Sequence, residues 1–493
     1  MQCPGKYVMG FLLMLCPFCV LRSQIGGSGT GTGLEDSLLS RRPAPDSAQT
    51  NPTPASRPFI VRQILITGNN KTKENIILRE LPFKEDDEFQ LQELVARFED
   101  ARRLLMNTTL FHEAIVSLKR FEGYFVDISV EVKERWYLFP LPYFKPVDRN
   151  INQWLIEQKG QLSRVDYGLK VIYNNATGRN DKMNIWLVNG YTKRVSLGYD
   201  RLYFDRKMKW GMRIGINMGS NREVNYLTSE DKQLFFKDES QFVRSFMNFN
   251  TELTYRRAIK TRHRFGIAWN SERVLDTVAR LNPNYLPDGK TRLRFVDLYY
   301  AMSYFDVDFI PYPLKGYHAD IFLLKRGFNG AINLWEATGK VGGNWPIARK
   351  TWLGLRAAGT VKLPFNQPYL NRRLLGYGDF FMQGYEYFVI DGVAGGYLKG
   401  TITKQLLGFH IKVPPVKNLA IHPIPVKVYA KIYSNMGYVY NNDPRNSMFN
   451  NKMLYSGGVG IDIVTFYDFV MRFEWSFNQI GQNALYLHRK SYY

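Results

Sequence analysis

Few side chains in this 493-residue chain have the types and spacing that catalysis requires. No histidine stands at metal-ligand spacing from another histidine, a cysteine or a carboxylate. The six are His112, His263, His318, His410, His422 and His488. The sequence also contains no Gly-x-Ser-x-Gly elbow, no phosphate-binding glycine loop and no His-Glu-x-x-His motif. We therefore expect no enzymatic activity, no catalytic residue, no cofactor and no metal site.

All three cysteines lie within the first twenty residues, at Cys3, Cys16 and Cys19. Lys6 followed by an apolar run over residues 8–21 is typical of a secretory signal, which predicts a signal peptide over residues 1–23. Lipid attachment at Cys19 is the alternative. If this segment is removed, the mature protein has no thiol, and it then needs neither a disulfide framework nor a cysteine-based metal site.

Residues 24–57 form a low-complexity segment of Gly, Ser, Thr, Ala and Pro. Such a composition cannot bury enough apolar surface to order the chain. We predict a disordered linker that tethers the segments on either side of it.

One aromatic stretch, residues 379–392, is too rich in rings for an ordinary exposed loop. The segments on either side of it, 352–361 and 397–405, alternate like strands. A long aromatic loop between two strands must bury its rings, and the inside of a barrel is one place to do so. Gly384 would let the backbone turn or approach another surface closely. An ordinary aromatic hairpin loop is the alternative.

The pattern of residues 59–135 predicts that they form a small α/β unit. Strands are expected at 59–67, 111–119 and 124–133, and helices at 73–81 and 90–105. The second helix has apolar residues at helical spacing, which gives it one buried face: Leu91, Leu94, Phe98, Ala101 and Leu105.

From residue 136 onward, many segments of about ten residues alternate between apolar and polar side chains. Residues 210–217, 426–433 and 469–478 are examples, and about fifteen candidate strands can be counted. A soluble sandwich alternates too, but in a membrane barrel the apolar face meets lipid and the charged face meets a polar lumen. The predicted signal peptide, the aromatic content of 15% and the number of such segments favour the barrel. The pattern does not fix the strand boundaries near residues 221–236 and 280–345.

The charge balance is strongly basic, with 66 Lys and Arg against 44 Asp and Glu. A basic chain can bind nucleic acid, but it also suits contact with anionic lipid headgroups. Since no basic helix or nucleic-acid motif is present, we expect a lipid bilayer as partner and no nucleic acid.

Two sets of residues resemble a known family. The order β-α-α-β-β, with Gly68-Asn69 after the first strand and Leu110-Phe111 after the second helix, resembles a POTRA domain. Gln383-Gly384-Tyr385 followed by Asp391-Gly392 resembles the Arg-Gly-Phe/Tyr loop motif of the BamA/TamA family of outer-membrane barrels, in which this loop folds back into the lumen. Gln383 departs from the family, where an Arg is usual. The terminal Tyr492-Tyr493 partly matches a barrel-assembly signal.

The resemblance implies a mainly β protein: a 16-stranded antiparallel transmembrane β-barrel over residues 136–493, preceded by one POTRA domain over residues 58–135. It implies the outer membrane of a Gram-negative bacterium, with the POTRA domain in the periplasm. Such a protein assembles, inserts or translocates unfolded outer-membrane or secreted polypeptides through a laterally gated barrel, with periplasmic accessory proteins as further candidate partners. The alternative function is a passive anion-preferring pore or a ligand-binding barrel.

Three groups of residues are then candidates for the site. The lumen loop motif consists of Gln383, Gly384, Tyr385, Asp391 and Gly392. The POTRA edge expected to hold substrate consists of Phe111, His112, Ala114, Val116 and Leu118. The barrel seam, expected between residues 165–173 and 484–489, consists of Gly168, Leu169, Leu485 and Leu487.

Overall fold

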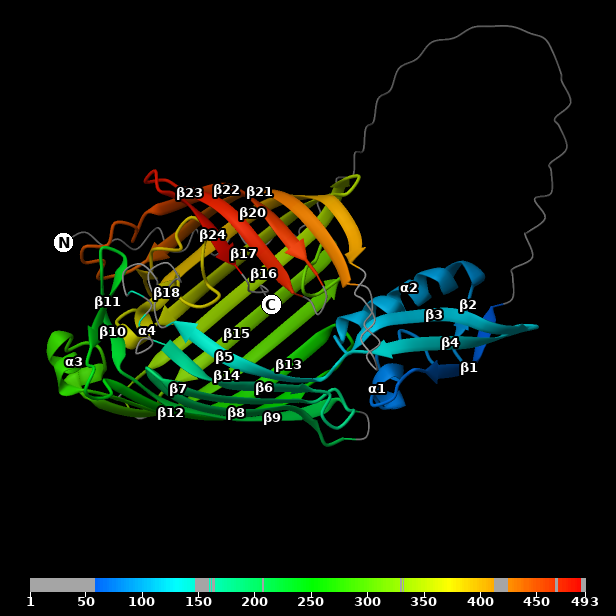
Figure 1. The fold of residues 1–493 in the computed structure, drawn as a ribbon, viewed down its shortest axis with the longest axis horizontal. Helices are drawn as coiled ribbons and strands as arrows, with labels where there is room; N and C mark the ends of the chain where they lie inside the picture. Colours follow the sequence, from blue (N-terminus) through cyan, green and yellow to red (C-terminus); the bar gives the residue numbers. More distant parts are fainter. Residues whose placement is uncertain are drawn as a thin grey trace, which may run out of the picture. The chain divides into compact units, whose positions relative to one another are not determined.

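The computed structural model describes residues 58–146, 159, 161, 165–205, 208–328, 330, 332–411, 424–465 and 469–488 (Figure 1). The predicted signal peptide, the linker over 24–57 and the terminal Tyr492-Tyr493 lie outside the described residues.

The first unit is a four-stranded sheet with two helices. Its elements are β1 (Phe59–Thr67), α1 (Glu74–Leu78), β2 (Glu88–Phe89), α2 (Leu91–Asn107), β3 (Phe111–Glu122) and β4 (Phe125–Glu134). The sheet order is β2-β1-β4-β3, with β1 parallel to β4 and β3 antiparallel to it. The predicted order of elements is confirmed. The two-residue β2 was missed because two residues cannot show a strand period.

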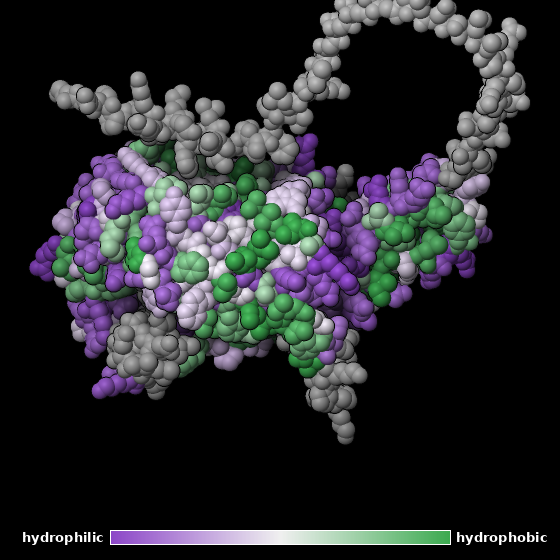
Figure 2. Space-filling view, turned by 90° about the horizontal axis from the view of Figure 1, so that it is seen from above, coloured by the Kyte–Doolittle hydropathy of each residue, from purple (hydrophilic) through white to green (hydrophobic). Residues whose placement is uncertain are grey.

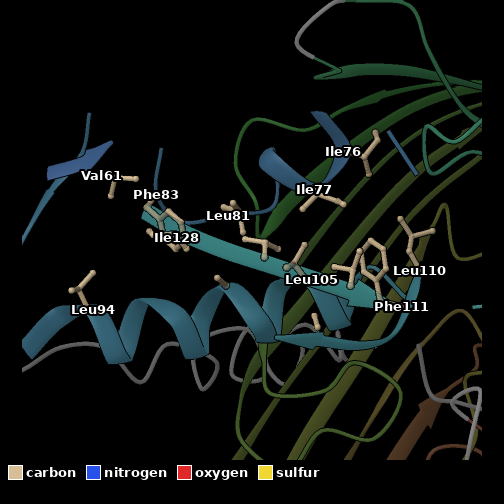
Figure 3. Close-up of a cluster of buried hydrophobic side chains, with 14 of the residues drawn as sticks. Val61, Ile76, Ile77, Leu81, Phe83, Leu94, Leu105, Leu110, Phe111 and Ile128 are labelled. Carbon is tan, nitrogen blue, oxygen red and sulfur yellow. The ribbon is translucent and has the colours of Figure 1, made fainter. Parts of the chain in front are cut away.

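The core of this unit lies between the helices and the sheet. Leu94 and Leu105 of α2 point toward the sheet residues Phe111 and Ile128, and Ile76 of α1 belongs to the same cluster (Figure 3). Each of these side chains is at most 5% exposed. Leu94, Ala101 and Leu105 thus lie on the buried face, as their helical spacing predicted. Leu91, which the same spacing placed on that face, is the first residue of α2 and is 59% exposed.

The second unit is a 16-stranded sheet in which every neighbouring pair is antiparallel. Its strands are β5 (Leu138–Pro146), β6 (Val165–Asn174), β7 (Lys182–Gly190), β8 (Thr192–Tyr203), β9 (Trp210–Asn221), β12 (Arg244–Tyr255), β13 (Thr261–Val274), β14 (Arg292–Val307), β15 (Gly316–Arg326), β16 (Leu334–Ala348), β17 (Thr351–Leu363), β20 (Ala394–Ile411), β21 (Ile424–Tyr440), β22 (Met453–Val464), β23 (Val470–Asn478) and β24 (Asn483–His488). The predicted fold class is confirmed, and five strands follow the aromatic loop.

The remaining elements connect barrel strands at the end away from the first unit (Figure 1). They are the hairpin β10 (Glu223–Ser229) and β11 (Lys232–Lys237), α3 (Asp276–Leu281), the 3-10 turn Pro287–Gly289, α4 (Tyr369–Arg372), β18 (Arg373–Leu375) and β19 (Ile390–Asp391). The ambiguous stretch 221–236 therefore forms a hairpin beyond the barrel wall. Within the described residues, no helix combines the length and the apolar character needed to cross a membrane.

The burial pattern of the strands is the reverse of a soluble sandwich. In β23, Trp475 and Phe477 are 52% and 53% exposed, whereas the alternate residues Arg472, Glu474 and Ser476 are buried. Apolar side chains also gather in patches on the outer surface of the barrel (Figure 2). A polar inside and an apolar outside are what a barrel in lipid requires, because lipid offers no partner to a charge.

The position of the first barrel strand corrects the sequence prediction. Residues 165–173 belong to β6, which is paired on both sides: Leu169 lies opposite Pro142 of β5 and opposite Leu187 of β7. Gly168 and Leu169 are therefore not at a sheet edge. The two edge strands are β5 and β24, and no backbone ladder joins residues 138–146 to residues 483–488. Figure 1 shows far-wall strands between these two edges.

Candidate functional site

The aromatic loop lies between β17 and β20 and is closed at its base by its own short ladder. Residues of β18 pair with β19, so that Arg373 lies opposite Asp391 and Leu375 opposite Ile390. The rings between them pack against inward-facing residues of the barrel wall. The buried cluster that results contains Leu374, Leu375, Met382, Tyr385, Phe388, Ile390, Val439, Phe449 and Leu454.

Gly384 lies where the loop approaches the wall closely. Its φ is +89°, a backbone conformation that residues other than glycine rarely adopt. A Cβ added there would lie 2.9 Å from Cβ of Ser456 and 3.1 Å from the carbonyl oxygen of Phe477. Asn478 of β23 donates its side-chain amide to the carbonyl of Gly384 at 2.7 Å. The expected positive φ and close contact are both confirmed.

Gln383 lies beside a buried carboxylate of the wall. Its amide donates to Glu474 of β23 over 3.4 Å, which is a long hydrogen bond. The cation beside Glu474 comes from the wall instead, because Nζ of Lys431 on β21 lies 2.6 Å from the same carboxylate. In this chain the lysine beside Glu474 thus belongs to a barrel strand and not to the loop.

The other motif residues fix the ends of the loop. Tyr385 donates its hydroxyl to the carbonyl of Tyr455 at 3.1 Å and packs edge-on against Phe449. Asp391 accepts a hydrogen bond from Tyr377 at 2.8 Å. Gly392 leaves no space for a side chain, since its Cβ would meet Val439 at 2.4 Å. Four of the five predicted motif residues thus contact the barrel wall, and Asp391 is bonded to Tyr377 within the loop.

Sequence reasoning did not predict that charged residues of the last strands pair with one another on the lumen side. Lys431 bridges Asp462 and Glu474, each at 2.6 Å, and all three are buried. His488 of β24 contacts Glu474 through Nδ1, and its Nε2 lies 3.8 Å from Glu386 of the loop. The only sequence signal was the polar phase of each alternating strand, which places side chains in the lumen but not beside one another.

The predicted substrate edge of the first unit is at an edge in the structure. β3 ends the sheet and is 12 residues long, whereas β2 at the other edge has two residues. Phe111 and Ala114 are buried in the domain core, His112 and Val116 are half-buried, and Leu118 is exposed. The edge is thus long enough for another strand to pair with it, and Leu118 is the predicted residue that remains most open for side-chain contact.

The first unit touches the barrel turns through buried charges. Glu80, which follows α1, accepts hydrogen bonds from Arg256 in the β12–β13 turn, one of them 2.6 Å long, and pairs with Arg79 at 3.2 Å. Burial raises the pKa of Glu80, but the hydrogen bond and charge of Arg256 and the charge of Arg79 outweigh it, and the pKa lies below its usual value. A second contact joins Arg103 of α2 to Asp306 at 3.0 Å.

Among the described residues, no three His, Cys, Asp or Glu side chains come together in a way that could hold a metal ion. The arrangement offers strand edges, a packed lumen loop and paired charges. Of these, a strand edge can pair with an extended polypeptide through main-chain hydrogen bonds.

Residues 59–135 match the POTRA family model, described as a surface antigen variable number repeat. A further relative is the outer membrane protein assembly factor BamA of Neorickettsia risticii (strain Illinois), 31% identical over 81 residues. That match covers 16% of this chain and 10% of the relative, so the chain spans about a tenth of that protein's length.

Solved structures match over most of the chain. CdiB from Escherichia coli has a TM-score of 0.51 at 9% identity, over 88% of this chain and 74% of that one. The chain therefore joins a POTRA domain over residues 59–135 to a 16-stranded antiparallel sheet, and its fold is similar to that of CdiB. BamA from Haemophilus ducreyi lacking POTRA domains 1–3 has a TM-score of 0.47 at 14% identity, over 87% and 83% of the two chains.

Proposed function

We propose that this POTRA–barrel protein assembles or translocates polypeptides at the outer membrane, with its POTRA domain in the periplasm. The client is an unfolded outer-membrane or secreted polypeptide, which pairs first with β3 and then enters the membrane between β5 and β24. The chemistry is strand pairing and involves no bond cleavage. Main-chain hydrogen bonds hold an extended segment with little demand on its sequence.

The observation that carries the proposal is the unpaired seam. Sixteen strands form one sheet, yet its first and last strands share no backbone ladder in the part of the chain that the structure describes. Unpaired N–H and C=O groups attract another strand, and in lipid they are costly until they are paired. An incoming strand would satisfy them.

The pore alternative gains little support from the lumen. An anion-preferring pore would use lumen-side cations such as Lys431 and Arg472, but these two lie beside the carboxylates of Asp462 and Glu474. Their charge is therefore compensated. The aromatic loop also packs along the wall of β20–β24, where an open channel would need free space.

The test is a covalent lock across the seam. In a background in which the three native cysteines are changed to Ser, one cysteine is placed in β5 near Phe144 and one in β24 near Leu485, and the register is scanned over neighbouring residues. A pair whose Cα atoms approach within about 7 Å forms a disulfide on oxidation. We expect the locked protein to lose client assembly, measured as folded barrel proteins in the outer membrane, and a reductant to restore it.

Each single-cysteine variant, treated with the same oxidant, is the control for oxidation itself. Full client assembly in a quantitatively locked barrel would contradict the proposal. A passive pore would keep its conductance when locked, so a planar-bilayer recording of the same sample separates the two functions.

A further inference from the structure

A cavity on the lumen side of the barrel is bounded by wall strands, by the aromatic loop and by the β14–β15 turn. It measures about 60 Å³, which is enough for several water molecules or for one small ion. Gln383 lines it from the loop, Asn344 from β16, Arg356 from β17 and Thr401 from β20. Segments that are far apart in the sequence therefore meet around one small space.

The β14–β15 turn encloses the cavity on one side, where Tyr312 and the two residues after it line the space. Tyr312 donates its hydroxyl to Asp462 of β22 at 2.9 Å, and its ring lies 4.8 Å from that of Tyr429 on β21. Asn107 of the POTRA domain accepts a hydrogen bond from the backbone N–H of Ile310 at 3.2 Å. The turn thus reaches strands that are not its neighbours in the sheet, and both of its sides have partners.

Two buried polar atoms of the lining residues have hydrogen-bonding capacity left over. Asn344 and Gln383 are 7% and 6% exposed. Among the described residues, neither Nδ2 of Asn344 nor Oε1 of Gln383 has a hydrogen-bond partner. The nitrogen of Gln383 already donates to Glu474, so its oxygen is the atom that remains. Buried polar atoms without a partner are rare and costly, so one donor and one acceptor call for a polar occupant.

The charges that line the cavity are mostly positive. Among the described residues, the lining cations are Arg356, Lys431 and Arg472, and the lining carboxylate is that of Asp462. Lys431 and Arg472 lie 2.6 Å and 3.8 Å from that carboxylate. Arg356 lies opposite Lys399 in the β17–β20 ladder, and like charges at opposite positions repel. An anion beside Arg356 would reduce this repulsion.

We propose that the cavity binds a small oxyanion that also carries a hydroxyl group, of which hydrogen phosphate is the simplest example. Nδ2 of Asn344 and the guanidinium of Arg356 donate to its oxygens, and its hydroxyl donates to Oε1 of Gln383. Sulfate has the same shape but no hydroxyl at neutral pH, so it leaves the Gln383 oxygen without a donor. The bound anion would link the loop to the wall. This inference goes beyond the proposed function and does not depend on it.

The test measures anion binding to the purified, folded protein in nanodiscs of a zwitterionic lipid. The probe is radiolabelled inorganic phosphate, in equilibrium dialysis at pH 7 and constant ionic strength. We expect saturable binding of one phosphate per chain. Unlabelled sulfate should compete at least roughly fivefold less well than unlabelled phosphate, because it forgoes the hydrogen bond to Gln383.

Asn344→Asp tests the donor. It replaces the amide with a carboxylate of nearly the same shape, so phosphate affinity should fall roughly tenfold or more. Asn184→Asp on β7, far from β16 in the sheet order, adds the same charge and is the matched control. It should change the affinity by less than about twofold, since charges screened by water and salt interact weakly at long range. The change of gel mobility on heating checks the folding of each variant.

Gln383→Leu tests the acceptor separately from the fold. It should lower the affinity for phosphate to about that for sulfate and leave sulfate binding unchanged, because only the hydroxyl of phosphate uses the Gln383 oxygen. A purely structural role of Gln383 would weaken the binding of both anions alike, and that result would contradict the assigned role.

The same phosphate chemistry occurs in the headgroup of phosphatidic acid. Nanodiscs with and without this lipid distinguish the two sources: competition with labelled phosphate would identify a lipid headgroup as the occupant, and no competition would identify the free ion. Absence of saturable phosphate binding, or equal binding of phosphate and sulfate to the unmodified protein, would overturn the inference. None of these measurements involves a client, so their outcome is separate from that of the seam lock.

Discussion

The POTRA domain and the lumen loop both contact the barrel, but the interactions in the two contacts differ. The POTRA domain meets the β12–β13 turn through charge, with Glu80 between Arg79 and Arg256. The lumen loop contacts the wall through close packing, with Gly384 against Ser456 and the backbone of Phe477. The charged contact is sensitive to the loss of one partner, because a buried ion without its counter-ion is costly. The packed contact is sensitive to added volume.

Glu80→Gln should give the largest effect. It removes the anion and leaves Arg79 and Arg256 together in a buried setting, which costs about 3 kcal/mol or more. The measurement is the fraction of molecules with a docked POTRA domain, from spin-label distances between the POTRA domain and the barrel. Glu74→Gln changes an exposed acid in α1, the helix that Glu80 follows, and is the matched control. A docked fraction unchanged by Glu80→Gln would show that charge does not hold this contact.

Gly384→Val should cost roughly 1–3 kcal/mol locally, from a strained φ and from the close approach to the wall. We expect lower barrel levels and weaker function than with Phe388→Leu, measured by heat-modifiable gel mobility and client assembly. Gly378→Val separates the two causes, since Gly378 also has a positive φ of +63° but nothing within 4 Å of an added Cβ. If Gly378→Val is as damaging as Gly384→Val, close packing at Gly384 is not the reason.

Gln383→Ala should have a small effect, of about 1 kcal/mol or less. Its hydrogen bond to Glu474 is long, and Lys431 remains bonded to that carboxylate. Protease sensitivity of the loop in the folded barrel would measure the change, with Gly384→Val as the positive comparison. A severe defect would mean that the amide, and not the shape of the loop, fixes this contact.

Lowering the pH from 7 to 5 should not change POTRA docking. The pKa of Glu80 lies below its usual value, so its contribution to docking is fully present above the ordinary glutamate range and is lost only as the pH falls through the lowered pKa. The same spin-label distances at pH 7, 5 and 3 test this. Glu80→Gln should remove its share of the acid dependence. Undocking already at pH 5 would mean that the pKa of Glu80 is not lowered by Arg256 and Arg79.

The sequence predicted the strands and helices whose apolar residues recur with a clear period, and it missed those without such a period. The alternating apolar and polar residues of β23 predicted both its strand and its two faces. β5 was missed as the first barrel strand because its prolines argue against a strand, and that omission moved the predicted seam one strand too far, to Leu169. Contacts between distant segments, such as Lys431 with Glu474, carry no local signal at all.

The last strand, β24, contacts the aromatic loop as well as its ladder partner β23. His488 reaches both Glu474 and Glu386, its ring lies 5.6 Å from that of Phe381, and Tyr486 lies 5.5 Å from Tyr387. The inward side of β24 therefore rests on the aromatic loop. Any movement of β24 into the bilayer must therefore slide these rings past one another or carry the loop along, so the position of the loop is coupled to that of the last strand.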